Sequence, residues 1–544
     1  MSDTVTSLEK HGTEGGVDQV EGGKLLVPGE GERFEVEWDA EAKVTPMGSM
    51  VFFGQYLKTG GLLDRFCRDT PLVYESPNAP DERDVMGTIL LSVINGQTRY
   101  AHINALRGDR VGAEVLGLSK VVSEDSVRRA LKRGTPAAWN RWLTGRERAV
   151  YETLLTEEYV LDIDNTVKSL YGHQEGAELG YNPQKPGRPS HNYHTYFIGT
   201  LRIVLGVEVM PGKQHSGKHS LPGLWRLIDG LPTACRPRLI RGDVSYGSEE
   251  SMLESEKRGQ MYLFKLRQTT RIREQIHRLE CDAGAWDDAG EGWQGSECRL
   301  KLMGWSRARR CIFLRRPAKE EAEPNALPAS TIREFEFVEH LKEGPSYEHI
   351  VLITNDTLPI VATSQLYRDR ADCENVFDEI KNQWGWAGFV TRDLHRCRII
   401  ARMIALIYNW WNVFTRLAQP EQHMEAITSR PLLLQAVGRL VTTGRRKIIR
   451  LTSTHAKAKH ISLALNRIGE FLNRLVRTAE QLSFEEIWAI ILSAAFVKWL
   501  RGKVLHPISD GTRRYYRSRR ETVTGVRVDK ATVLASPARL NCSF

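Results

Sequence analysis

The sequence lacks the cysteine pairs, the leader segment and the long apolar runs that mark several large protein classes. None of its eight cysteines forms a Cys-x2-Cys pair, which disfavours a zinc ribbon and a thiol redox motif. No apolar stretch reaches the roughly 20 residues needed to cross a bilayer, and the first residues do not resemble a signal peptide. We therefore expect a cytoplasmic protein with free thiols and no membrane partner.

The balance of charge is basic. The chain carries 76 Lys and Arg against 67 Asp and Glu, a formal net charge of +9. Such an excess favours a polyanionic partner, although many proteins without one carry a similar excess. The hydrophobic fraction of 41% and the length of 544 residues predict a globular chain with two or more domains.

The first 150 residues divide into an acidic tail and a helical region. Residues 1–33 hold seven acids against three bases and show no hydrophobic period, so we expect them to be disordered. Residues 45–150 have helical patterning. Within them, 111–116 and 123–133 predict two helices separated by a turn at Gly117.

The second of these helices is basic. Ser123 is a plausible N-cap, and Arg128 and Arg129 follow one to two turns later. Such a helix can be a DNA-recognition helix, or it can belong to an ordinary helical hairpin with a solvated basic face. This segment by itself favours neither interpretation.

From about residue 155 strands alternate with helices, which predicts an α/β fold with a mixed sheet. Strands are expected at 159–167, 193–199, 203–210, 238–243 and 261–266, with helices at 220–228 and 249–257. Residues 283–355 are rich in Trp, Arg and short β-like runs, which indicates a β-rich insertion. A strong helix is expected over 361–381, and the chain after 395 reads as helical to about 500.

Acidic residues lie within one predicted strand and at the end of another. In the strand 159–167, Asp162 and Asp164 share one face, and an acid within a strand is costly unless it is paired or binds a metal. Asp243 follows the apolar residues Leu239 and Ile240, at the strand end where α/β sheets place their chemistry. A turn-capping role is the alternative for each of them.

The helix over 361–381 carries a third acid with polar neighbours. At about 100° per residue, Tyr367, Arg370, Glu374 and Lys381 lie on one stripe. A solvated face with an Arg370–Glu374 pair is the plain interpretation. The chemical one is that Asp164, Asp243 and Glu374 bind two Mg²⁺ ions, which prefer oxygen ligands and promote phosphoryl transfer.

These residues resemble a known family. The spacing Tyr-x2-Arg-x3-Glu-x6-Lys, met by the same four residues, is similar to the signature of the insertion-sequence 4 superfamily of DDE transposases. Within it, the chain resembles the insertion-sequence 1380 family in the stretches L-D-I-D-N-T-V (161–167), G-Y-N-P-Q-K-P-G-R-P-S-H (180–191) and R-G-D-V-S-Y-G (241–247). The resemblance covers roughly residues 85–480.

The resemblance implies an RNase H-like catalytic domain interrupted by the β-rich insertion. Asp164, Asp243 and Glu374 would be its catalytic metal ligands, with Asp162 left open as a helper, and Mn²⁺ would be able to replace Mg²⁺. The reaction would be cut-and-paste transposition through hairpin ends, by a homodimer in a synaptic complex with terminal inverted repeats and target DNA. The setting would be the bacterial cytoplasm, at the nucleoid.

The resemblance also implies that a Trp of the insertion holds a flipped base. Trp286, Trp293 and Trp305 are candidates, and core packing is the more common role of any one of them. Lys185 and Arg188, in a Pro- and Gly-rich loop, are candidates for contacts with the DNA backbone beside Tyr367, Arg370 and Lys381. A plain surface loop is the alternative.

The expected organisation follows from these patterns together. It comprises a disordered acidic tail (1–33), a mostly helical N-terminal DNA-binding region (34–150), the first part of the catalytic domain (151–282), the β-rich insertion (283–355), the second part of the catalytic domain (356–415), a helical C-terminal region (416–500) and a basic tail (501–544). Two other functions remain open, namely a metal-dependent nuclease that does not join strands and a DNA-binding protein that has lost catalysis.

Overall fold

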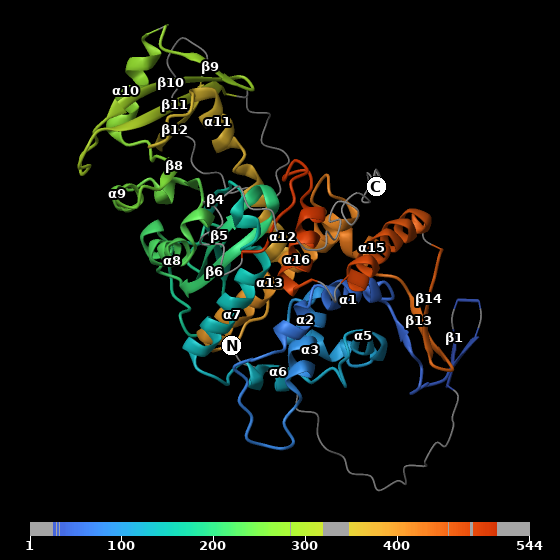
Figure 1. Ribbon diagram of the computed structural model, residues 1–544. Helices are drawn as coiled ribbons and strands as arrows, with labels where there is room; N and C mark the ends of the chain where they lie inside the picture. Colours follow the sequence, from blue (N-terminus) through green and yellow to red (C-terminus); the bar gives the residue numbers. More distant parts are fainter. Residues whose placement is uncertain are drawn as a thin grey trace. The chain divides into compact units, whose positions relative to one another are not determined.

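The chain forms two compact units, residues 1–43 and residues 44–544 (Figure 1). This computed structural model describes residues 25–28, 30–31, 33–282, 284–318, 347–454, 456–478 and 482–508. In the first unit, β1 (Leu25–Pro28) and β2 (Arg33–Val36) pair as an antiparallel hairpin. The end of the predicted tail is thus not disordered, because its backbone groups are paired in this ladder. The preceding part of that tail lies outside the described residues.

The second unit begins with short strand β3 (Val44–Thr45) and a series of helices, which confirms the helical patterning of this region. They are α1 (Met50–Thr59), α2 (Leu62–Phe66), α3 (Glu82–Ile94), α4 (Ile103–Leu106), α5 (Arg110–Val115), α6 (Glu124–Ala130) and α7 (Pro136–Tyr151). Gly117 turns the chain between α5 and α6 with φ +65°, a conformation that glycine adopts without strain. Ser123 accepts a hydrogen bond from Ser126 N and caps α6. The predicted helix, turn and helix are therefore present.

A nine-stranded mixed sheet follows and confirms the predicted α/β fold. Its first five strands are β4 (Val160–Ser169), β5 (Ser190–Ile198), β6 (Ile203–Pro211), β7 (Leu239–Gly242) and β8 (Met261–Lys265). They lie in the order β6-β5-β4-β7-β8, in which β4, β5 and β6 are antiparallel neighbours and β7 and β8 run parallel to β4. The parallel strands β4 and β7 therefore lie at the centre of this group.

The strands of the predicted insertion extend the same sheet. They are β9 (Asp287–Gly290), β10 (Trp293–Leu300), β11 (Arg309–Pro317) and β12 (Tyr347–Thr354). Strand β12 pairs antiparallel with β8, and β11, β10 and β9 continue outward from it. Figure 1 shows β9, β10 and β11 in yellow-green, with α10 (Thr270–Glu280) and α11 (Ile360–Arg368) beside them. A continuous hydrogen-bonded ladder thus joins the insertion to the central strands.

Helix α13 (Leu394–Ala418) covers the free edge of β6. The helix is buried over nearly its whole length. The Asn409 side chain accepts a hydrogen bond from Val204 N (2.9 Å) and donates one to Val204 O (2.7 Å). The amide thus takes the place of a neighbouring strand and satisfies an edge that would otherwise be open to pairing. Helices α8 (Gly217–Asp229) and α9 (Glu249–Lys257) connect β6, β7 and β8.

The helix expected over 361–381 is in fact two helices, so the single stripe of polar residues is a wrong prediction. Helix α11 ends at Arg368, and α12 (Ala371–Gln383) begins after Arg370. Arg370 N donates to Tyr367 O rather than to Leu366 O, which breaks the α-helical pattern. The Tyr367 side chain is buried in a cluster with Leu239 and Leu263, on the central strands.

The C-terminal region also departs from its predicted helical pattern. Helices α14 (Ala426–Leu433), α15 (Ala458–Thr478) and α16 (Phe484–Ala495) are present, but an antiparallel hairpin interrupts them. Its strands are β13 (Gly438–Thr443) and β14 (Arg446–Leu451). The residues Val441, Ile448 and Ile449 favour strand, and Gly444 turns with φ +58° in the two-residue loop.

The cysteines and the apolar helices bear on two expectations from the sequence. The six cysteines whose side chains are described are free thiols. Within the described residues, no helix is both long enough and apolar enough to cross a bilayer.

Candidate active site

The parallel pairing of β4 and β7 brings two of the predicted acids side by side. The paired residues end with Ile163 opposite Gly242, so Asp164 and Asp243 are the next residues on adjacent strands. Neighbouring strands lie about 4.7–4.9 Å apart. Gly242 is required here because a Cβ atom would lie 2.8 Å from the ring of Tyr246 and 3.0 Å from Ile163. The register therefore places Asp164 and Asp243 next to each other, and their role as metal ligands stays a prediction.

Asp164 is held firmly by its surroundings. The side chain is only 13% exposed, and its Oδ2 atom lies 2.6 Å from the Arg370 guanidinium. Its Oδ1 atom accepts a hydrogen bond from Asn165 N at 2.7 Å. The Asn165 amide in turn donates to His215 O at 3.0 Å. Arg370 precedes α12, so this ion pair places the start of α12 beside the middle of β4.

Asp243 caps the short helix Val244–Tyr246. Its Oδ1 atom accepts a hydrogen bond from Ser245 N at 2.9 Å. Burial raises the pKa of the Tyr246 hydroxyl, Asp243 and Asp164 raise it further, and Arg370 lowers it. One phenol thus senses both aspartates and the arginine, which supports a single charged centre at this edge of the sheet.

Glu374 lies on α12, four residues after Arg370, and its side chain is exposed. Four residues correspond to a rise of about 6 Å along the helix from the Asp164–Arg370 contact. Within the described parts of the chain, no group of three or more His, Cys, Asp or Glu is placed to hold a metal ion. The convergence of Glu374 with the two aspartates therefore stays a prediction.

Asp162, which the sequence left open as a helper, belongs to a buried ion pair. Arg241 lies directly opposite it on β7 and contacts it in bidentate fashion, at 2.6 Å (Nε to Oδ1) and 2.9 Å (Nη2 to Oδ2). Each residue is 1% exposed, and Gly199 N donates to Asp162 Oδ2 at 3.2 Å. Arg241 also donates to Leu366 O, at the end of α11.

Arg241 is a site residue that sequence reasoning missed. The available signal was an arginine between the apolar Ile240 and Gly242 in the predicted strand 238–243. A buried guanidinium needs a carboxylate partner, and Asp162 was the acid on the neighbouring strand. Arg241 joins β4, β7 and the end of α11, so it positions the segment that carries Arg370.

The other predicted DNA contacts are scattered. Arg128 pairs with Glu124 at 3.0 Å, and Arg129, on the same helix α6, has a side chain that is 77% exposed. Lys185 and Arg188 each lie 4.9 Å from the ring of the exposed Tyr171.

Lys381, on α12, is half-buried, and burial lowers the pKa of its ammonium while Asp378 raises it. Tyr367 is 8% exposed, so it does not share an exposed helix face with Arg370, contrary to the sequence prediction. Roles of all these residues in binding DNA stay predictions.

The tryptophans of the insertion differ in exposure. Trp293 and Trp305 are buried, with 5% and 8% exposed, as core packing requires. Trp286 is half-buried and stacks beneath the Arg315 guanidinium at 4.1 Å. The structure thus leaves Trp286 as the most accessible of the three.

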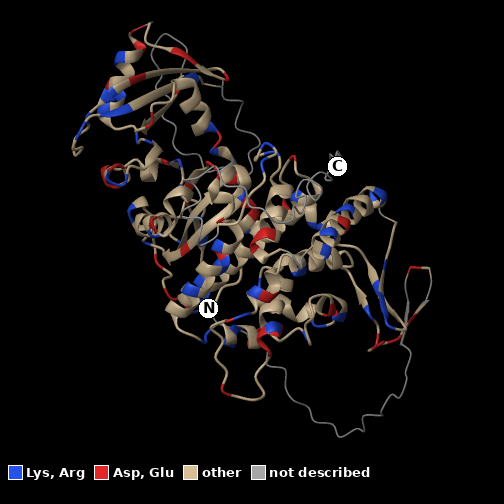
Figure 2. Ribbon diagram, viewed as in Figure 1, with Lys and Arg blue, Asp and Glu red and all other residues tan. Residues whose placement is uncertain are grey.

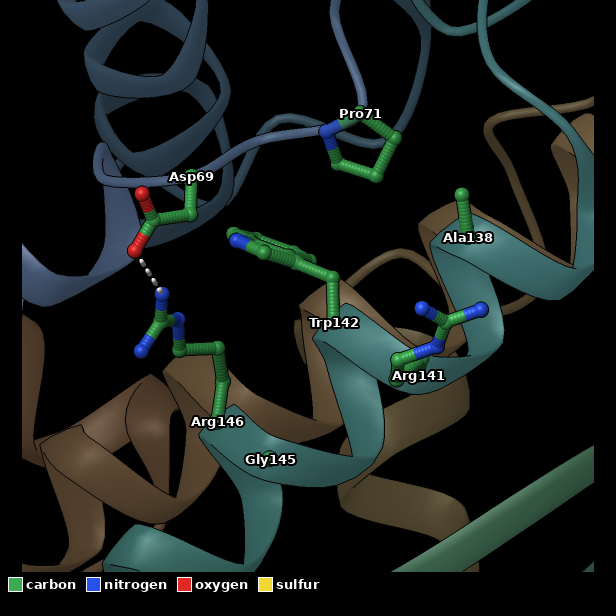
Figure 3. A pocket seen from close by; sticks show the side chains of 7 residues that line it. All are labelled: Asp69, Pro71, Ala138, Arg141, Trp142, Gly145 and Arg146. Atoms are coloured by element: carbon green, nitrogen blue, oxygen red, sulfur yellow. Dashed lines mark ion pairs between the residues drawn. The ribbon is translucent and has the colours of Figure 1, made fainter.

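A pocket on α7 is separate from the aspartates. It has a volume of about 370 Å³ and is lined by Asp69, Pro71, Ala138, Arg141, Trp142, Gly145 and Arg146 (Figure 3). Arg146 pairs with Asp69 across it at 3.9 Å, and Trp142 Nε1 donates to Arg68 O at 3.0 Å. None of the candidate site residues lines this pocket.

Lys168 gives the site strand a pH-dependent stability. It lies on β4 on the same face as Asp164, is buried, and donates to Gly388 O and to the Tyr193 hydroxyl (3.3 Å). Burial lowers the pKa of its ammonium to about 8. Between pH 8 and the ordinary value of 10.5 the unfolded chain binds the extra proton, so the free energy of unfolding rises with pH in this window.

The test compares wild type with Lys168→Met, which keeps most of the length of the side chain and removes the charge. From pH 7 to pH 10, wild type is expected to gain about 2–3 kcal/mol of unfolding free energy relative to the variant. Urea denaturation at several pH values measures the difference. A difference that does not change with pH would show that Lys168 keeps its ordinary pKa.

The sheet and its two aspartates define the class of protein, and a family model narrows it further. A mixed sheet with two aspartates just beyond the paired residues of adjacent parallel strands defines an α/β protein with an acidic site on those strands. The family model described as "Transposase DDE domain group 1" matches residues 79–472, and the chain belongs to this family. It is thus a transposase-family protein, of the kind that mobile DNA elements encode.

Solved structures and curated proteins give no further support for the assignment. The chain is similar to a cryo-electron-microscopy structure of the piggyBac transposase synaptic complex with hairpin DNA, at 11% identity and over 90% of each chain. The TM-score of 0.32 is too low to carry an argument. No curated protein matches the sequence.

Proposed function

We propose that this protein is a DNA transposase that cuts at the ends of its element and joins them to target DNA. The single observation that supports this most is the pairing of β4 with β7, which sets Asp164 and Asp243 side by side in a chain of the transposase family. The finer resemblance to the insertion-sequence 1380 family belongs to the proposal, as do the passage through hairpin ends and the synaptic homodimer. The proposed setting is the bacterial cytoplasm, at the nucleoid.

Asp164, Asp243 and Glu374 are the proposed metal ligands. They offer only carboxylate oxygens, the donor set that Mg²⁺ and Mn²⁺ accept, so their chemistry fits two divalent ions. When bound, such ions would stabilise charge on the phosphate and on the leaving oxygen. Arg370 and Asn165 N fix the orientation of Asp164 before DNA arrives, so little reorganisation is needed during reaction.

The proposed reaction has two kinds of step. In hydrolysis, a water oxygen forms a bond to phosphorus, and the 3′ oxygen of the transposon end leaves with a proton. In transesterification, the freed 3′-hydroxyl attacks a phosphodiester on the opposite strand and forms the hairpin. A second hydrolysis opens the hairpin and frees the 3′-hydroxyl again, which then attacks a phosphodiester of the target. Each transesterification releases one 3′ oxygen and keeps the number of phosphodiester bonds. Tyr367, Arg370 and Lys381 remain the proposed DNA contacts near this centre.

A strand-transfer assay tests the proposal. The donor is a duplex with the inverted repeats that flank the coding sequence, and the target is a supercoiled plasmid, with Mg²⁺ or with chelator. We expect joined donor–target product in Mg²⁺ only. Cleavage without joining would indicate the nuclease alternative, and binding without cleavage would indicate a protein that has lost catalysis.

A further inference from the structure

The hairpin of β13 and β14 is an exposed, mostly two-stranded ribbon. In its sheet, β3 pairs only with Gly438 and Arg439, so the rest of the ribbon has no third strand. Strand β14 is an edge strand, and its residues Ile448 and Leu451 are 39% and 37% exposed. A two-stranded ribbon has little stability of its own, so its presence calls for a physical reason.

The two faces of the ribbon differ. Alternate residues share a face, and the face with Leu440 and Lys447 turns toward the protein: Leu440 is buried, and Lys447 pairs with Glu114 of α5 at 2.6 Å. The opposite face carries Arg439, Arg446 and Arg450, all of them exposed. This set of three arginines is called here the outer arginine face. The ribbon is thus anchored on one side and cationic on the other.

The outer arginine face lacks counter-charges. Considering only the described residues, Arg439, Arg446 and Arg450 form no ion pair or side-chain hydrogen bond. The register places Arg439 directly opposite Arg450, and like charges in that position destabilise a ladder. Folding therefore leaves an electrostatic repulsion in place that an anionic partner would relieve.

The charge of the whole chain is concentrated in the same region. Residues 438–478, which comprise the ribbon and α15, hold ten Lys and Arg against one Glu, a net charge of +9. The remainder carries 66 bases and 66 acids, so the net charge of the chain resides in this stretch. Figure 2 shows Lys and Arg along β13, β14 and α15. On α15, Ala464, Ile468 and Leu472 are buried, whereas Arg467 and Arg477 are exposed.

We infer that the outer arginine face of the β13–β14 ribbon is a docking surface for duplex DNA, contacted chiefly at its phosphates. A two-stranded antiparallel ribbon fits the major groove of B-DNA, which is about 12 Å wide. Guanidinium groups are suited to phosphate oxygens. The inference rests on the proposed function for the choice of DNA over an acidic protein, and it assigns the task to a ribbon rather than to α6, whose Arg128 and Arg129 already pair with acids.

The experiment compares two variants, each of which lacks three positive charges. The ribbon variant is Arg439→Gln, Arg446→Gln and Arg450→Gln, and the control is Lys58→Gln, Arg226→Gln and Lys257→Gln, which lowers the net charge equally at exposed positions on α1, α8 and α9. Fluorescence anisotropy measures binding of wild type and variants to a random-sequence duplex and to a duplex with the element's own end, over a series of salt concentrations.

For the ribbon variant we expect the dissociation constant at 0.15 M salt to rise at least about tenfold on both duplexes, and the slope of log K against log salt to shrink by about 2–3, near 0.9 per lost phosphate contact. The control should stay close to wild type. The melting temperature of the ribbon variant should be unchanged or higher, since the repulsion between Arg439 and Arg450 is removed, which separates lost binding from lost folding.

Two results would overturn the inference, and a third bears on the proposed function. Unchanged affinity and slope in the ribbon variant would show that the ribbon is not a docking surface. If wild type still binds both duplexes, the proposed function stands without it. Equal losses in the ribbon variant and the control would mean that only the overall charge matters. Failure of wild type to bind either duplex would count against the proposed function itself, and with it against the ribbon.

Discussion

Asp243→Ala is expected to abolish cleavage of transposon ends, with a loss of at least about 10²–10³-fold, while binding of the end stays near wild type. The carboxylate lies at the end of β7 beside Asp164 and is half-exposed, so it can face DNA and metal. Within the fold, its side chain caps the short helix Val244–Tyr246 by accepting a hydrogen bond from Ser245 N at 2.9 Å. Loss of a cap costs about 1 kcal/mol, too little to explain lost activity by unfolding.

Glu374→Gln should have the same effect, because the change keeps the size of the side chain and removes its charge. The matched control is Asp378→Asn, another exposed acid on α12, which contacts Asn382 at 2.7 Å. Gel assays of cleavage and anisotropy of end binding separate the two readouts. Near wild-type cleavage in Asp243→Ala or Glu374→Gln would discard the assignment of that residue, and a loss as large in Asp378→Asn would point to a general effect on α12.

Arg241→Met is expected to lower the free energy of unfolding by about 3–5 kcal/mol. The change leaves the Asp162 carboxylate buried and without its guanidinium, since the pair is 1% exposed on each side. The double variant Asp162→Leu and Arg241→Met should regain most of that stability, because an apolar pair of similar volume replaces two buried charges at little net cost.

Activity should not return with stability. In the double variant the Leu366 carbonyl still lacks the donor that Arg241 supplies, so the end of α11 is no longer held against β7. Cleavage is therefore expected to stay low in a well-folded protein, as a positioning role requires. Urea denaturation gives the stability and the gel assay gives the activity. A double variant as unstable as the single one, or one with full cleavage, would contradict this role.

Several features of the molecule follow from local sequence, and the structure confirms them. The alternation of Leu161, Asp162, Ile163 and Asp164 predicts a strand with both acids on one face, and β4 has that form. Ser123 predicts the start of α6 because its hydroxyl can accept a backbone hydrogen bond within the next turn. Such signals depend on neighbours a few residues away, so they can be read from sequence without knowledge of the fold.

Other features depend on partners far along the chain. The break between α11 and α12 accompanies a contact between Arg241 and Leu366, which are 125 residues apart. The role of Asp162 depended on its register with β7, because a slip of one residue would have placed it opposite Gly242. The β13–β14 ribbon stands where helix was predicted: Val441, Ile448 and Ile449 favour strand locally, and the ribbon is anchored by the contact of Lys447 with the distant Glu114.

By itself, the sequence determined the strands and caps, the mixed α/β fold, and the acids at 164, 243 and 374 as the candidates for chemistry. Only the tertiary structure decided that Asp164 and Asp243 are neighbours, that Asp162 is committed to Arg241, and that part of the excess positive charge lies on an exposed ribbon. The physical reason is that periodicity and capping are interactions within a few residues, whereas register and ion pairing are settled by which distant segments bury one another.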